Sequence, residues 1–149
     1  MVHDINQELQ SGDENRILSA LYDLSGDERS FSLDVNSISL IPKFLSSSNE
    51  DIVWRSIFFF GIVKPNPILA DYIVDVARKW AARAPHIVLA SIDSLARMLD
   101  VGVLGGGRCG ELASDLVDIP KVDLARVFDL QKLCDGCISY KEYVERARV

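Results

Sequence analysis

The sequence predicts an all-α protein, organised as a short α-solenoid of about four helical hairpins in a single domain over residues 1–149. Three observations carry this prediction. Apolar residues recur at steps of three and four, a similar pattern returns after 35 residues, and prolines and polar turn residues separate the copies. A chain of 149 residues fits one domain that can bury a sizeable core.

The repeat is clearest between residues 51–63 and residues 86–98. A shift of 35 residues superimposes their apolar positions and places the small residue Gly61 on Ala96. A small residue at this position fits a close approach between two helices. A weaker copy follows 35 residues later, and another precedes at residues 16–24, so each unit is expected to contain two helices.

The first half of the chain shows where its helices begin. Residues 30–39 form a long polar connector, and the next helix should start near Ser39, because Pro42 is tolerated only in a first turn. Residues 46–51, "SSSNED", supply turn and cap residues. The helix over residues 51–63 is apolar nearly all round, as expected with neighbours on both sides, and the alternative for its second half is a buried strand.

The second half is divided by similar signals. In "KPNP", Asn66 is a plausible N-cap and Pro67 the first helical residue. "ARAPH", residues 82–86, breaks the next pair of helices. Near the end, Gly136 fits the position after a helix C-terminus, and Ser139 fits the N-cap of a final helix.

Composition excludes some functions and leaves others open. The formal net charge of −6 argues against a protein that binds nucleic acid by neutralising phosphates. Residues 1–34 hold eight acids and two bases, whereas residues 35–149 hold fourteen of each, so the first segment carries the whole excess. This acidic end either keeps the chain soluble or faces a basic partner.

No segment predicts a membrane span or an export signal. The uncharged run of residues 56–63 is much shorter than the roughly 20 residues that a spanning helix needs. The N-terminal residues lack a basic region followed by an apolar core. Cys109, Cys134 and Cys137 are too few for a disulfide framework. We therefore expect a cytoplasmic protein in a reducing compartment.

Two motifs resemble ligand sites but lack essential parts. Gly105, Gly107 and Gly110 match the spacing of the dinucleotide fingerprint, but no strand precedes them, so we expect a flexible break between the third and fourth hairpins. Residues 134–143 resemble the second half of a calcium-binding EF-hand loop. The first ligand positions of that loop lack carboxylates, so too few oxygen ligands remain.

Metal and catalytic chemistry lack support as well. Cys134 and Cys137 have the spacing of half a zinc site or of a redox pair, but a closed zinc site needs four ligands. Only Cys109, His86 and His3 remain, at no recognised spacing. No serine or cysteine stands in a nucleophile motif. The sequence predicts no cofactor, no metal and no catalytic site.

A triplet such as "DIV", then a helix, then a small residue after a bulky one, as in "FFFGIV" and "SLARML", resembles the HEAT-like helical repeats. The resemblance covers residues 14–134, about four units, two of them well matched. It implies a right-handed α-solenoid, here with a C-terminal capping helix, that binds other macromolecules. The first and fourth copies depart from the pattern, as terminal capping repeats do.

The resemblance also indicates a binding face. Second helices form the ligand-facing wall of HEAT-like solenoids, and on residues 86–100 a polar stripe remains outside when the apolar positions turn inward. The stripe includes Asp93, which Arg97 is expected to neutralise in part.

In the other copies, Tyr22, Phe58 and Phe128 hold the position of Asp93. Such aromatic residues either anchor a partner or, for Phe58 and Phe128, belong to the core. The residues predicted to bind a partner are Asp13, Glu14, Tyr22, Asp23, Asp51, Phe58, Asp93, Arg97 and Asp100.

Three classes of function remain. The first is a non-catalytic immunity protein that neutralises a cognate bacterial toxin, because a small acidic protein suits a basic, nuclease-type active site. The second is an adaptor or regulatory subunit of a larger assembly. The third is an enzyme, for which the glycine-rich segment is the only hint. We expect a protein partner with a basic surface, and no nucleic acid, membrane or small-molecule cofactor.

Overall fold

The computed structural model describes residues 4–26 and 32–148, and within these ranges it contains helices and no β-strand. The prediction of an all-α protein is confirmed. The strand alternative for residues 57–63 is wrong, because these residues continue a helix without interruption.

The chain begins with a pair of helices, α1 (Ile5–Leu9) and α2 (Glu14–Gly26). Two short helices follow, α3 (Val35–Ile38) and α4 (Ile41–Leu45). Part of the predicted connector is therefore helical, because the Asp34 side chain accepts a hydrogen bond from the amide of Ser37 and caps α3. Helix α4 begins two residues after the predicted start at Ser39.

The central apolar segment forms α5 (Glu50–Ile57), capped by Asn49, and continues as the π-helix η1 (Phe58–Val63). The 3₁₀-helix η2 (Pro67–Asp71), α6 (Ile73–Trp80) and α7 (Pro85–Asp100) come next. The predicted N-cap is confirmed, because the Asn66 side chain accepts a hydrogen bond from the amide of Ile68.

The last three helices are α8 (Gly106–Val117), α9 (Leu124–Cys134) and α10 (Tyr140–Ala147). The glycine-rich segment is not the flexible break that we predicted, since Gly106, Gly107 and Gly110 lie inside α8. Only Gly105 stays extended, as the N-cap. The predicted end signals are confirmed: Gly136 has a φ of +75°, and Ser139 caps α10.

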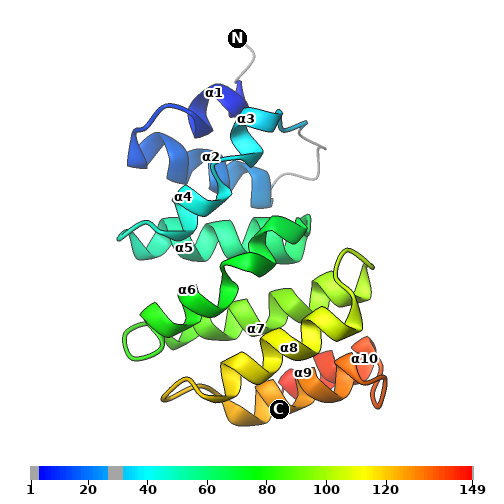
Figure 1. Ribbon diagram of the computed structural model, residues 1–149. Helices are drawn as coiled ribbons and strands as arrows, with labels where there is room; N and C mark the ends of the chain where they lie inside the picture. The colour runs from blue at the N-terminus through cyan, green and yellow to red at the C-terminus, as the bar shows by residue number, and fades with distance from the viewer. Residues whose placement is uncertain (1–3, 27–31, 149) are drawn as a thin grey trace.

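The helices stack in two layers along the length of the molecule (Figure 1). In one layer α2, α5, α7 and α9 contact one another in that order. In the other, α1 contacts α3, α4 contacts η2, and α6 contacts α8. Helix α10 lies on α9 and α7 and covers one end of the layer that α2, α5, α7 and α9 form. Below, we call α2, α5, α7 and α9 the second layer.

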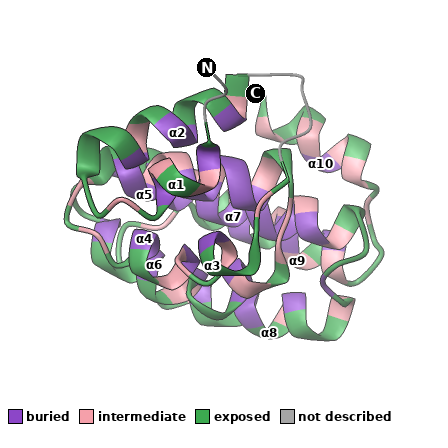
Figure 2. Ribbon diagram, turned by 90° about the horizontal axis from the view of Figure 1, so that it is seen from above, coloured by how far each residue is buried: buried purple, intermediate pink, exposed green. Residues whose placement is uncertain are grey.

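Buried apolar residues form one continuous core between the layers, from Ile5 to Tyr143 (Figure 2). At its centre Gly61 lets η1 approach α7 very closely. A Cβ atom at Gly61 would lie 2.5 Å from the Cβ of Ser94 and 2.8 Å from a methyl carbon of Leu69. The close approach predicted from this small residue is therefore present.

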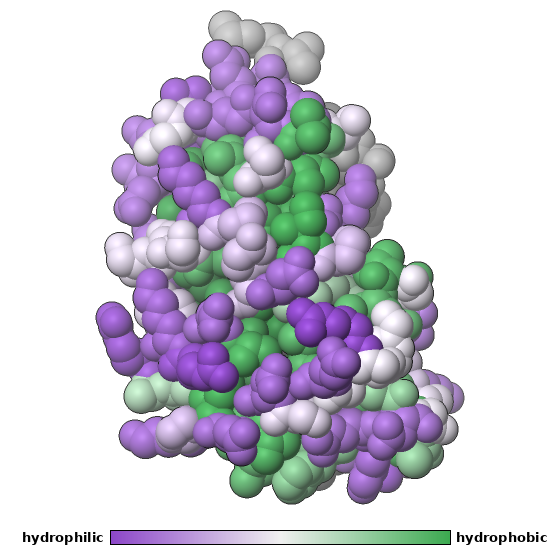
Figure 3. All heavy atoms as spheres, in the orientation of Figure 1, coloured by the Kyte–Doolittle hydropathy of each residue, from purple (hydrophilic) through white to green (hydrophobic). Residues whose placement is uncertain are grey.

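Figure 3 shows the face of the molecule on which α4, α6 and α8 lie. Hydrophilic side chains interrupt the hydrophobic surface there, over the middle and lower part of the molecule. Hydrophobic residues are more continuous near α3, where Val35 is 79% exposed. Across the described residues, each helix is too short or too polar to traverse a bilayer.

Candidate functional site

A row of aromatic and basic side chains crosses three helices of the second layer. The Arg55 guanidinium carbon of α5 lies 3.9 Å from the ring centroid of Tyr22 on α2 and 4.7 Å from that of Trp54. Trp54 stacks on Phe58, with centroids 5.4 Å apart and 5° between the ring planes. His86 of α7 extends the row, 6.4 Å from Trp54. We call these five residues the aromatic row.

The helical period explains why α5 and the first residue of η1 present three of these side chains together. Trp54, Arg55 and Phe58 occupy the positions that remain when the other apolar face turns into the core. That inward face consists of Ile52, Val53, Ser56 and Ile57. Sequence reasoning identified Tyr22 and Phe58 but missed Trp54 and Arg55. A single charge beside a tryptophan within an apolar helix was the available signal.

The exposure of the aromatic residues decides between anchor and core. Tyr22 is 58% exposed and Phe128 is 46% exposed, whereas Phe58 is half-buried under its stack with Trp54. The alternative that Phe128 belongs to the core is therefore wrong. Phe58 lies at the boundary, where one ring face packs on the protein and the rest meets solvent.

Arg55 is held by aromatic rings rather than by carboxylates. Within residues 4–26 and 32–148 its guanidinium forms no ion pair and donates no hydrogen bond, although it carries five N–H donors. Rings on two helices restrict its orientation. A guanidinium held in this way is preorganised to donate to a carboxylate or backbone carbonyl of a partner.

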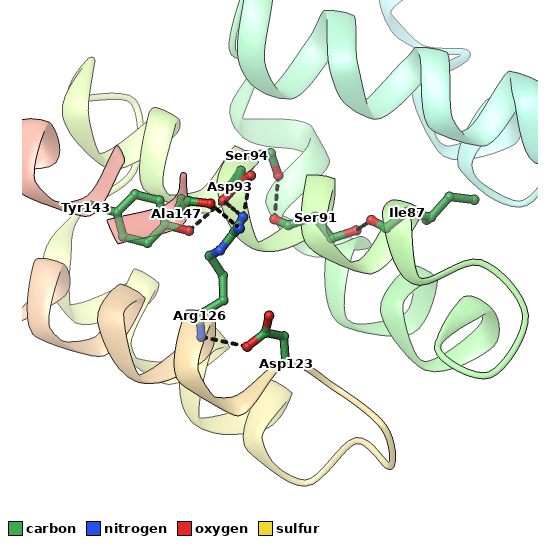
Figure 4. Close-up of polar contacts among 8 residues, drawn as sticks. All are labelled: Ile87, Ser91, Asp93, Ser94, Asp123, Arg126, Tyr143 and Ala147. Carbon is green, nitrogen blue, oxygen red and sulfur yellow. Dashed lines mark hydrogen bonds and ion pairs between the residues drawn. The ribbon is translucent and has the colours of Figure 1, made fainter. Parts of the chain in front are cut away.

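Asp93 lies in a different environment, inside a network that joins α7, α9 and α10 (Figure 4). Arg126 Nη1 lies 2.9 Å from both carboxylate oxygens of Asp93, and the Tyr143 hydroxyl donates to Oδ1 at 2.7 Å. Arg126 also donates through Nη2 to the carbonyl of Ala147 at 3.1 Å. Asp123, the N-cap of α9, accepts from the backbone amide of Arg126. We call Asp93, Arg126 and Tyr143 the polar network.

Burial and charge in the polar network shift two pKa values. Burial raises the pKa of Tyr143 far above its usual range, and the neighbouring Asp93 carboxylate adds to this shift. Burial lowers the pKa of the Arg126 guanidinium, but Asp93 outweighs that effect, and the pKa is raised overall. Tyr143 therefore stays protonated as a donor, and Arg126 stays charged.

Contrary to our expectation, Arg97 does not neutralise Asp93. Its Nη1 pairs with Asp100 at 3.1 Å, and its Nε donates to the carbonyl of Ile62 in η1 at 3.3 Å. Its guanidinium also lies 6.0 Å from the ring centroid of Tyr140. The cation that meets Asp93 comes instead from α9, 33 residues along the chain.

Three of the six predicted acidic residues, Asp13, Glu14 and Asp51, lie at helix N-termini. The Asp13 side chain accepts hydrogen bonds from the amides of Asn15 and Arg16 and so caps α2. Glu14 accepts from the side chain of Asn49, the residue before α5. The first turns of α2 and α5 therefore share one edge of the second layer.

The other acidic residues differ in position. Asp51 is exposed in the first turn of α5, and Asp23 is exposed directly after Tyr22. Asp27, Glu28, Arg29 and His3, which also entered the sequence argument, lie outside the described residues. The structure thus brings Tyr22 and Phe58 together, and it separates them from Asp93 and from the acidic edge.

A pocket of about 390 Å³ opens at this acidic edge, between the α1–α2 turn and the α4–α5 turn. Buried apolar residues, among them Ile17, Phe44 and Ile52, form its floor, and Lys43 and Glu14 lie at its lining. No arrangement of three or more His, Cys, Asp or Glu side chains suited to a metal ion occurs among the described residues.

The cysteines differ from the sequence-based expectation. Cys109 of α8 and Cys134 of α9 form a disulfide, with Cα atoms 6.0 Å apart, whereas Cys137 is free and exposed. The small number of cysteines argued against a framework of several disulfides. It did not reveal that two helices adjacent in sequence bring one pair into contact.

The comparisons with known proteins add no relative. No protein-family model, no curated protein and no solved structure matches this chain. Fold and surface define an all-helical protein with an exposed aromatic row on its second layer. The HEAT-like resemblance stays a prediction.

Proposed function

We propose that this chain is a non-catalytic protein-binding module, built as a short right-handed α-solenoid of about four HEAT-like hairpins with α10 as its capping helix. The order of contacts within each layer supports this architecture, because every hairpin touches mainly its neighbours along the stack. The contact between Arg97 and Ile62, 35 residues apart, matches the sequence period.

The observation that carries the proposed function is the aromatic row. Tyrosine, tryptophan and arginine are the residues that most often anchor protein–protein interfaces. Here one of each meets on adjacent helices, with Tyr22 more than half exposed and the Arg55 donors unused within the described residues. A surface of this composition suits a protein partner.

The partner we favour is a cognate bacterial toxin with a basic, nuclease-type active site, which makes this chain its immunity protein. The net charge of −6 would steer a basic protein toward it. Glu14 and Asp51 mark an acidic edge on the same layer as the aromatic row, and Asp23 follows Tyr22 directly in the chain. Charged residues at the rim and aromatic residues at the centre are the usual arrangement of an interface.

Co-expression tests this proposal. The protein encoded by the gene directly upstream is expressed in a bacterial host with and without this chain. We expect growth arrest by the upstream product alone and recovery with this chain. Recovery should weaken when Tyr22→Ala and Arg55→Ala are combined, and the matched control Tyr72→Ala, exposed on the other layer, should protect fully.

If the upstream product is harmless, or this chain gives no protection, the immunity function is wrong. The aromatic row then favours the second function, an adaptor or regulatory subunit of a larger assembly. The same variants separate the two, because an adaptor would lose co-purification with its assembly without any effect on growth arrest.

A further inference from the structure

Cys109 and Cys134 meet where α8 lies against α9, and Cys137 follows three residues later in the chain. Cys109, in the first turn of α8, is fully buried, and its disulfide partner Cys134 is the last residue of α9. Their Cα separation of 6.0 Å is within the range of protein disulfides. A Cβ atom at Gly106 would come within 3.0 Å of the Cys134 carbonyl oxygen, so the two helix ends are in direct contact.

The third cysteine lies in the turn that directly follows α9. The amide of Gly136 donates to the carbonyl of Leu133, and the amide of Cys137 donates to the carbonyl of Lys132 at 2.8 Å. Together these bonds form a Schellman motif, with Gly136 in the left-handed conformation. The motif places Cys137 beside the last turn of α9, three residues from Cys134 and exposed to solvent.

We propose that Cys109, Cys134 and Cys137 form a thiol–disulfide exchange site in which Cys137 is the attacking thiol. The Cys137 thiol loses its proton to solvent, and its thiolate attacks the Sγ of Cys134. The Cys134–Cys137 bond forms, the Cys109–Cys134 bond breaks, and Cys109 leaves as a thiolate that takes up a proton. One disulfide replaces another, so the step needs no oxidant or reductant.

Accessibility assigns these roles. An attacking thiol must reach a sulfur of the bond, and Cys109 has no exposed surface, so attack at Cys134 is the open route. Cys137 is the exposed thiol nearest in the chain, and only Asp135 and Gly136 separate the two residues. The glycine lets this short segment change conformation as the new bond closes.

The exchange would alter how α8 is held. The Cys109–Cys134 disulfide links residues 25 positions apart and ties α8 covalently to α9. A Cys134–Cys137 disulfide closes a far smaller loop within one turn, so it restricts the unfolded chain less. The site would therefore convert a tie between two helices into a local turn and free a buried thiol. This inference does not depend on the proposed function.

The tryptic peptides of this chain distinguish the two disulfides. Trypsin separates residues 109–121, which contain Cys109, from residues 133–141, which contain both Cys134 and Cys137. The original disulfide joins the two peptides. The exchanged disulfide leaves them apart, with residues 133–141 lighter by two hydrogens and Cys109 available for alkylation.

The experiment uses the oxidised full-length chain, incubated at mildly alkaline pH without added thiol, quenched with acid and then alkylated with N-ethylmaleimide. We expect alkylated Cys109, together with an internal disulfide in residues 133–141. In the control Cys137→Ser, Cys109 should be alkylated on the order of ten times more slowly. This control changes only an exposed side chain, so the fold should persist, and circular dichroism checks it.

Two results would overturn the proposal. One is a wild-type chain in which Cys137 alone is alkylated and the two peptides stay joined throughout. The other is an equal rate of Cys109 alkylation in wild type and Cys137→Ser, because release would then not require Cys137.

Discussion

Arg55 and Arg126 connect successive helices of the same layer, but they do so in opposite environments. Arg55 reaches back to Tyr22 and Arg126 to Asp93, a separation of 33 residues in each case. The Arg126 side chain is only 16% exposed, and it is bound to the Asp93 carboxylate and to the Ala147 carbonyl of α10. Arg55 lies between aromatic rings, without any acceptor among the described residues.

The difference follows from what covers each arginine. Helix α10 lies over α9 and α7, and it supplies both the Tyr143 hydroxyl and the Ala147 carbonyl to the polar network. A charge that is desolvated needs partners, and the network provides them. The aromatic row lies farther up the stack, on α2, α5 and the start of α7. An arginine that connects two helices is thus enclosed and paired with a carboxylate at one end of the layer, and lies among aromatic rings farther along it.

The largest expected effect tests this contrast directly. Arg126→Met should lower the free energy of unfolding by about 2–4 kcal/mol. The Asp93 carboxylate would lose its ion pair in a partly buried site, and of the polar network only Tyr143 would still donate to it. Arg55→Met should cost less than about 1 kcal/mol, since it loses only cation–π contacts near the surface. Urea unfolding followed by circular dichroism gives both values. Equal losses would show that the two arginines contribute equally to the free energy of unfolding, and would contradict the contrast between them.

Gly61 tests the helix spacing on which both regions depend. Gly61→Ala should cost about 1–3 kcal/mol, because the new Cβ would collide with Ser94 of α7 and with Leu69. Gly107→Ala is the matched control, since its Cβ would meet no atom within 4 Å and alanine favours a helix. Thermal unfolding should show opposite shifts for the two variants. A neutral Gly61→Ala would mean that η1 and α7 can move apart freely.

Tyr143 makes the polar network sensitive to alkaline pH. Its pKa is raised in the folded chain by burial and by Asp93, so above pH about 10 the unfolded chain releases a proton that the folded chain retains. The unfolded chain then binds fewer protons, and stability falls as pH rises.

Tyr143→Phe should cost about 1 kcal/mol at neutral pH, through the lost hydrogen bond to Asp93, and should reduce this alkaline fall. Unfolding free energies measured between pH 7 and 11 would show it, with circular dichroism to confirm the fold at each pH. Parallel curves for wild type and variant would contradict the assigned environment of Tyr143.

Tyr22 should give the smallest change in stability. Tyr22→Ala removes an exposed ring and should alter the free energy of unfolding by less than about 0.5 kcal/mol. If the aromatic row anchors the partner, the same change should weaken binding by about 1–3 kcal/mol, mainly through faster dissociation. Stopped-flow measurements with the partner that the co-expression experiment identifies would separate the two effects. If Tyr22→Ala dissociates from the partner at the wild-type rate, Tyr22 does not belong to the interface.

Sequence reasoning predicted the ends of several helices correctly, but it predicted few of the contacts between helices. The caps at Asn66 and Ser139 and the left-handed Gly136 were predictable, because each depends on a few neighbouring residues. The flexible break expected at the glycine-rich segment was wrong. Helix packing against α9 outweighed the low helix propensity of Gly106 and its neighbours.

The pairing of charges could not be predicted in the same way. Within one helix, Arg97 was the natural partner of Asp93, because it lies one turn away. In the structure Asp93 pairs with Arg126 and Arg97 pairs with Asp100, because α9 and α10 bring Arg126 and Tyr143 next to Asp93. Trp54 and Arg55 were missed for a similar reason. Their importance depends on Tyr22 and His86, which come from other helices.

By itself, the sequence determined that this protein is helical, which helix faces turn inward, and where several of its helices begin and end. These properties rest on the 3.6-residue period and on local capping, which involve residues close together in the chain. The enclosure of Asp93 in a network and the position of Arg55 among aromatic rings became visible with the packing of the helices. Burial and pairing depend on which helices lie against each other, and a one-helix pattern carries no information about its neighbours.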